Sequence, residues 1–298
     1  MEPRSRLELA NDNAAGQWLA LAGVEGWETR SGTGWAAVRC GDGTGNAHQV
    51  QLTRAPADAA ELTGQLVALF REWDTRWLSL VDPYGAVDLS RFGCERTLPT
   101  PVMVRDPGPV PSRPGGRRAA AGGAAGPSAV EEVVVAAAVV GPEAGGAVAV
   151  GAVEVVEAAT EGELADVERV VVEGFPVAPR LPWRRGATFP AGWDVLAGRR
   201  SWLARLRGEP VGACVSWDDG ASVGVYWVAV LPEHRSRGIA RELMAAVLRA
   251  HPDRPAVLSA TLLGEPLYRR LGFVEQGVAT WWRYPGTGMG APGPTAAP

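Results

Sequence analysis

The sequence predicts an α/β protein in which helices flank a mixed β-sheet. Over residues 147–285, apolar runs of strand length alternate with amphipathic repeats in the order β-α-β-β-β-α-β-α-β. The clearest junction follows the apolar run Val223–Val230, which Pro232 ends. From Ile239 onward, apolar residues recur at helical spacing. We therefore expect a buried strand, a tight turn and a helix over residues 223–250.

The other elements of this segment have signals of their own. Thr160 and Glu163 form a capping box that starts a helix, and Phe175-Pro176 ends it. Residues 176–200 are rich in Pro, Gly, Arg and Trp, which indicates a long loop or short helices. Further strands are expected at residues 148–158, 201–206, 211–217, 255–261 and 278–284, and a further helix at 265–271.

The turn between the buried strand and the helix has the composition of an anion-binding site. It reads Arg235-Ser236-Arg237-Gly238-Ile239-Ala240. A glycine lets the backbone approach a ligand closely, and the N–H groups at a helix N-terminus attract negative charge. The ligand that suits such a turn is a pyrophosphate, although an ordinary polar turn with solvated arginines would have a similar sequence.

This hexad resembles the Arg/Gln-x-x-Gly-x-Gly/Ala signature of the GCN5-related N-acetyltransferases (GNAT). A second segment, Leu267-Tyr268-Arg269-Arg270-Leu271-Gly272-Phe273, resembles the Leu-Tyr and Gly-Phe motif of the same family. The resemblance is strong over residues 150–285 and weaker toward the front of the chain. It implies the acyl-CoA N-acyltransferase fold, a central splayed mixed sheet flanked by helices, with acetyl-CoA as co-substrate and no metal.

The resemblance also implies roles for particular residues. Tyr268 stands at the position of the general acid that protonates the leaving thiolate. Thr261 stands where many relatives carry an Asn that contacts the cofactor, so this contact must differ here. The expected cofactor-binding residues are the strand backbone at Val228, Ala229 and Val230, the loop and helix start at Arg235, Ser236, Arg237, Gly238, Ile239 and Ala240, and Thr261.

The general base and the acceptor site are not readable from the sequence. The strand that leads into the hexad, Val223–Val230 (the signature strand), contains no carboxylate. Glu173 is either a substitute base or a solvated residue at a helix end. Acceptor specificity is expected in residues 160–200 and around Trp281-Trp282. Four aromatic residues either line an acceptor pocket or cover the sheet: Phe175, Trp183, Phe189 and Trp193. Three arginines would suit an acidic acceptor: Arg180, Arg184 and Arg185.

The front of the chain resembles a degenerate copy of the second half. The alternative is a coincidental match between two αβ segments. Aligning Gly93 with Gly272 places Leu89 on Tyr268 and, within a residue, Val50–Leu52 on the signature strand. Residues 53–58 have no Gly-x-Ala turn, so this copy is not expected to bind CoA. We therefore predict a degenerate domain at 1–105, a Pro/Gly/Ala-rich linker at 106–146, a catalytic domain at 147–285 and a disordered tail at 286–298.

Composition limits the remaining functional classes. The net charge of −4 gives no indication of a nucleic-acid partner, and all 29 basic residues are Arg. The most apolar stretch, residues 129–160, carries five glutamates, so no membrane span is expected. Three distant cysteines fit neither a disulfide framework nor a metal site and predict a reduced, cytoplasmic protein.

These observations predict a tandem GNAT-like N-acetyltransferase with one active half. The acceptor would be a primary amine of a small molecule or peptide, attacking the bound thioester directly without a covalent enzyme intermediate. The two halves could pack as a pseudo-dimer. The alternatives are a non-catalytic acyl-CoA-binding module, which the missing base favours, and an interaction scaffold.

Overall fold

The first half of the chain supplies a helix-strand set that ends at residue 105. The computed structural model describes residues 4–41, 46–73, 77–97, 99–111, 153–175 and 180–285. The elements of the first half are α1 (Arg6–Glu25), β1 (Glu28–Gly32), β2 (Trp35–Arg39), β3 (His48–Leu52), α2 (Ala59–Trp73), β4 (Trp77–Asp82), the 3₁₀ turn η1 (Ser90–Phe92), β5 (Glu95–Arg96) and β6 (Thr100–Arg105).

The second half confirms the predicted element order. Thr160 and Glu163 form the capping box reciprocally, and the helix that they start ends at Gly174 with Phe175 as its C-cap. The elements are β7 (Val153–Glu157), α3 (Glu161–Gly174), η3 (Ala191–Trp193), β8 (Arg199–Leu206), β9 (Glu209–Asp218), β10 (Val223–Val230), η4 (Pro232–His234), α4 (Ile239–Ala250), β11 (Ala256–Ser259), α5 (Glu265–Arg270) and β12 (Val274–Pro285).

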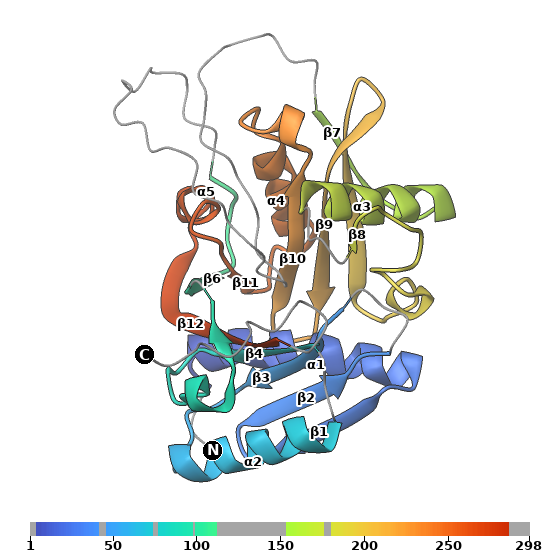
Figure 1. The fold of residues 1–298 in the computed structure, drawn as a ribbon. Coiled ribbons are helices and arrows are strands. Elements are labelled where there is room, and N and C mark those ends of the chain that lie inside the picture. Colours follow the sequence, from blue (N-terminus) through green and yellow to red (C-terminus); the bar gives the residue numbers. More distant parts are fainter. Residues whose placement is uncertain are drawn as a thin grey trace, which may run out of the picture.

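One sheet of 12 strands runs through both halves (Figure 1). Its order is β1-β2-β3-β4-β12-β6-β11-β10-β9-β8-β7, with β5 paired to β12 off this path. The two halves exchange their last strands: β6 lies between β11 and β12, and β12 in turn pairs with β4. A cut at residue 105 therefore does not separate two independent sheets, an arrangement that the sequence did not indicate.

The repeat within the chain is visible in the topology. In each half an antiparallel pair leads into a parallel pair, β3 with β4 and β10 with β11. Gly93 and Gly272 both have a left-handed φ, 81° and 89°. Each ends a helical turn with the same two hydrogen bonds, so Leu89 and Tyr268 occupy the same place in the two turns. The expected second copy is thus present, with its last strand exchanged.

Three apolar cores hold the layers together. The core shared by the halves packs residues of α1 and α3 against one face of the sheet. The opposite face is covered by α4 and α5 in the second half and by α2 and η1 in the first. Figure 1 shows α2 and α4 near opposite ends of the sheet. The sequence interpretation missed α1, although Ser5 and Glu8 form a capping box at its start.

The predicted linker begins as an anchored segment. Arg105 binds the carbonyl oxygens of residues 106, 108 and 109, and Val110 packs against the core of the second half. Residues 112–146 and the predicted tail at 286–298 lie outside the described residues, as do 148–152 of the first expected strand. Among the described residues, no helix has the length and apolarity to cross a membrane, and no cluster of His, Cys, Asp or Glu could hold a metal ion.

Candidate active site

The predicted anion-binding turn has an uncapped helix at its end. Gly238 is the N-cap of α4 with a φ of 83°, and among the described residues no side chain caps the helix. Ser236 also has a left-handed φ, 62°, which is unusual for a residue with a side chain. The first backbone N–H groups of α4 have no partner within the helix. They are therefore available to an anion, and the expected binding at Ile239 and Ala240 stays a prediction.

A close approach between α4 and β9 fixes the position of this helix. A Cβ added to Gly212 would lie 2.7 Å from Cγ2 of Ile239 and 3.2 Å from Cδ1 of Leu243. Ile239 and Ala240 are themselves buried in the core of this half. The start of the helix is therefore held against the end of β10 by packing rather than by a cap.

The two arginines of the turn have different environments. Arg235 donates from Nε to the Val230 carbonyl at 3.2 Å and from Nη2 to the Gly174 carbonyl at 2.9 Å. Burial lowers the pKa of its guanidinium. Its side chain thus joins the ends of α3 and β10 through these two donors, and the expected contact of Arg235 with a phosphate stays a prediction. Arg237 is exposed, and its side chain can reach a ligand.

Strands β10 and β11 separate soon after they begin. They pair only at Val223 with Ala256 and at Gly224 with Val257, whereas β10 pairs with β9 as far as Val230. The edge of β10 that faces β11 is therefore not used by that strand at Val228, Ala229 and Val230. This is the splay expected from the resemblance, and it leaves backbone groups for an extended ligand to pair with.

A β-bulge interrupts β10 within this open stretch. The register with β9 shifts between Tyr226 and Ala229, and Trp227 has a φ of 57°. A left-handed conformation costs an ordinary residue about 1–2 kcal/mol, so surrounding contacts must hold it. The ring of Trp227 is packed edge-on by Phe175 and Phe189, and the Arg180 guanidinium lies 4.6 Å from its centroid. No pattern in the sequence predicted this bulge.

Tyr268 is buried in the core that also contains Val228 and Val230 of β10 and Leu258 of β11. It is 1% exposed, and its ring meets Phe273 edge-on at 5.8 Å. Burial raises the pKa of its phenol, with a smaller contribution from Cys214 on β9. The fold brings Cys214 close enough to influence the tyrosine, although the two are 54 residues apart in the sequence. Burial also raises the pKa of this thiol, which keeps it protonated and unreactive.

Thr261 has a local structural partner. Its hydroxyl oxygen accepts a hydrogen bond from the Gly264 backbone N–H at 3.0 Å, in the turn that starts α5. A threonine hydroxyl can also donate one hydrogen bond. The expected contact of Thr261 with a cofactor stays a prediction.

The acceptor-side loop is held by a residue that the sequence interpretation missed. The Glu168 carboxylate, 2% exposed on α3, accepts hydrogen bonds from the backbone N–H groups of Gly186, Thr188 and Phe189 at 2.8–2.9 Å. It also accepts one from Nε1 of Trp183. The position of Glu168 on the buried face of the helix, where a carboxylate is uncommon, was the signal available in the sequence.

The expected acceptor-side residues lie in different places. Phe189 and Trp193 stack at 4.6 Å in the shared core, where Trp281 is also buried, while Trp282 belongs to the core of the first half. Glu173, the candidate base, forms an ion pair with Arg169 at 3.1 Å and is partly exposed. Of the three arginines, Arg180 is buried at the bulge, while Arg184 and Arg185 are exposed.

Comparison with known proteins agrees with this geometry. Residues 197–275 match the family model of the acetyltransferase (GNAT) domain, which spans β8 to the start of β12. No curated protein matches the chain. The match confirms the resemblance inferred from the two motifs.

Solved structures resemble both halves together. A GCN5-related N-acetyltransferase from Kribbella flavida has a TM-score of 0.58 at 19% identity, covering 93% of this chain and 96% of its own. A conserved protein of unknown function from Staphylococcus epidermidis has a TM-score of 0.53 at 13% identity, with 86% and 93% covered. A GNAT-family protein from Novosphingobium aromaticivorans has a TM-score of 0.50 at 16% identity, with 91% and 96% covered. At these identities the likeness establishes the fold of the whole chain.

Proposed function

We propose that the second half is an acyl-CoA-dependent N-acyltransferase that transfers acetyl from acetyl-CoA to a primary amine. The observation that carries this proposal is the open edge of β10, which leads directly to the uncapped N-terminus of α4. An extended thioester donor needs such an edge for its amide-rich arm and such a helix end for its diphosphate. The residues present fit acetyl-CoA as a co-substrate.

Binding, carbonyl polarisation and thiolate protonation then each have a group to perform them, while no residue is assigned to deprotonate the amine. The amine nitrogen attacks the thioester carbonyl carbon, a C–N bond forms, and the C–S bond breaks. A backbone N–H of the bulged stretch around Trp227 polarises the carbonyl oxygen. The amine enters as the free base and, after its attack, loses a proton to solvent water. Tyr268 gives its phenolic proton to the departing thiolate and regains one from solvent. The phenol of Tyr268 is protonated at neutral pH even at its ordinary pKa near 10, and burial raises that pKa further.

The acceptor belongs to the same proposal. We place its amine on the side of β10 where Arg180 and the aromatic rings surround Trp227, in a small molecule or a peptide end. The strand exchange supports the idea that the two halves pack as a pseudo-dimer. Three free, buried cysteines support a reducing, cytoplasmic location.

The experiment offers acetyl-CoA and a panel of amines to the chain and measures the release of the CoA thiol. We expect the native chain to release thiol with at least one amine. Tyr268→Phe should lower kcat by about 100-fold or more and leave the dissociation constant of CoA unchanged. An unchanged kcat would show that Tyr268 is not the acid.

A non-catalytic acyl-CoA-binding module is the second candidate. It is favoured by the lack of a carboxylate on β10 and by the pairing of Glu173 with Arg169. In that case CoA would raise the melting temperature of the chain, because it binds the folded state, but no amine in the panel would release thiol.

A further inference from the structure

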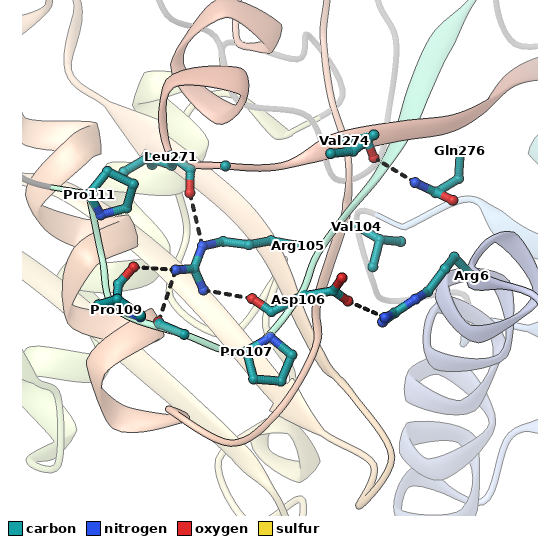
Figure 2. A pocket seen from close by; sticks show the side chains of 12 residues that line it. Arg6, Val104, Arg105, Asp106, Pro107, Pro109, Pro111, Leu271, Val274 and Gln276 are labelled. Atoms are coloured by element: carbon teal, nitrogen blue, oxygen red, sulfur yellow. Dashed lines mark hydrogen bonds and ion pairs between the residues drawn. The ribbon is translucent and has the colours of Figure 1, made fainter.

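The junction between the halves contains an arginine that contacts the turn carrying Tyr268. Arg105 is the last residue of β6, the strand that the first half contributes to the sheet of the second. Its Nε donates a hydrogen bond of 2.9 Å to the carbonyl oxygen of Leu271, the C-cap of α5 (Figure 2). Leu271 lies three residues after Tyr268, within the same helical turn.

The remaining donors of this guanidinium hold the chain that leaves β6. Nη1 donates to the Asp106 carbonyl at 3.1 Å, and Nη2 donates to the carbonyls of Gly108 and Pro109 at 2.9 and 2.7 Å. Among the described residues, no carboxylate forms an ion pair with Arg105. Figure 2 shows the guanidinium between Leu271 on one side and the Asp106–Pro109 segment on the other, at a cavity of about 410 Å³. A planar group with five N–H donors suits this set of carbonyl oxygens, and a lysine does not.

The contact with Leu271 acts on a tightly connected turn. The Tyr268 carbonyl accepts hydrogen bonds from the N–H groups of Leu271 and Phe273, both at 3.0 Å. Gly272, at a φ of 89°, closes the turn, and the Phe273 ring contacts the Tyr268 ring. A shift of the Leu271 carbonyl therefore moves the same backbone that sets the direction of the tyrosine side chain.

The strand position that corresponds to Arg105 carries a different residue in the other copy. The strand register pairs Arg105 with Ala256 of β11 and Tyr284 with Leu78 of β4, so Tyr284 takes the corresponding position in β12. The copy that carries Tyr268 thus has an arginine at this strand position, and the copy that carries Leu89 has a different residue there.

We propose that Arg105 is a positioning residue through which the first half holds Tyr268 in its productive place. The inference rests on the proposed function, because it assigns Tyr268 as the acid. The first half then has a specific role in the reaction. It supplies the central strand β6 and, at the end of that strand, the arginine that fixes the turn carrying Tyr268.

The test is a double-mutant cycle on the full chain. Arg105→Lys keeps the charge but loses the planar set of N–H donors, and Arg105→Gln loses the charge as well. In the native background we expect Arg105→Lys to lower kcat about tenfold with an unchanged KM for acetyl-CoA, since a small misplacement of a reacting group is costly. In the Tyr268→Phe background the same change should lower kcat less than twofold. An equal loss in both backgrounds would overturn the proposal.

A second measurement does not depend on activity. Hydrogen exchange of the peptide spanning residues 265–273 should be faster in Arg105→Lys and faster still in Arg105→Gln, while that of β8 and β9 is unchanged. Unchanged exchange at 265–273 in folded protein would overturn the proposal. If Tyr268→Phe itself has full activity, the acid assignment fails instead, and the exchange experiment alone decides whether Arg105 holds the turn.

Discussion

The two parallel strand pairs of this molecule differ in how far they stay together. In the first half, β3 pairs with β4 at four successive positions from His48 to Gln51, almost the whole of β3. In the second half, β10 pairs with β11 only at its first two residues and continues without that partner to Val230. The same topology thus has a closed form and an open form, and only the open form leaves a backbone edge for a ligand.

The helices that follow these strands differ in the same sense. At α2, Oδ1 of Asp58 accepts hydrogen bonds from the N–H groups of Ala60 and Glu61 at 2.8 and 3.0 Å. At α4, the matching N-cap is Gly238, which has no side chain to offer. In the first half, the helix end that corresponds to the proposed anion site is thus capped by a carboxylate. The two copies differ locally at a strand edge and a helix end while they share the fold.

Exchanging the caps gives the largest expected effect. Gly238→Asp would give α4 the cap of α2, and Asp tolerates a left-handed φ better than most residues with a side chain. The carboxylate would bond the first N–H groups of the helix and repel a diphosphate. We expect the dissociation constant of CoA, measured by calorimetry, to rise by about 100-fold, which corresponds to roughly 2.7 kcal/mol.

Gly238→Asn is the matched control. It has nearly the same size and the same tolerance of a left-handed φ, but no charge. We expect its affinity for CoA to fall by about tenfold at most. If the two variants bind CoA equally well, the carboxylate does not explain the difference between the two helix ends.

The reverse change in the first half should have a smaller effect, on stability alone. Asp58→Ala removes the cap of α2 and should lower the free energy of unfolding by about 1 kcal/mol, while Asp58→Asn should keep most of it. Urea unfolding followed by circular dichroism measures both. Because β3 and β4 stay paired, neither variant should gain a second CoA site. A stoichiometry of two in Asp58→Ala would contradict the importance that we give to the strand pair.

Much of the second half could be predicted because its signals are local. The apolar run of β10, Pro232 and the repeat starting at Ile239 place the strand, turn and helix within a few residues. Thr160 and Glu163 place the start of α3 in the same way. The two motifs then led to the GNAT domain that the family model confirms over residues 197–275.

The features that were missed depend on residues far apart in the chain. The exchange of β6 and β12 joins segments more than 150 residues apart, and no local pattern records which sheet a strand enters. The two carbonyl partners of Arg235, at Gly174 and Val230, were not foreseen because they are backbone groups with no sequence signature. The bulge at Trp227 and the nearness of Cys214 to Tyr268 likewise arise only when strands pair.

The smallest expected effect concerns the pH dependence that separates Tyr268 from an exposed tyrosine. Burial raises its pKa above the ordinary value near 10, so the folded enzyme holds the phenolic proton more tightly than the unfolded chain does. The associated stability is fully present below about pH 10 and is lost as the pH rises through the higher, folded-state pKa. With a saturating amine, kcat should therefore change by less than about twofold between pH 8.5 and 10, where an unshifted tyrosine would be half ionised. A stopped assay of thiol release at each pH, with circular dichroism to verify folding, measures this. A decline centred near pH 9 in folded protein would mean that the proton-donating group is not this buried tyrosine. The difference between Tyr268 and Leu89 at the same position of the two turns would then not explain why only one half is active.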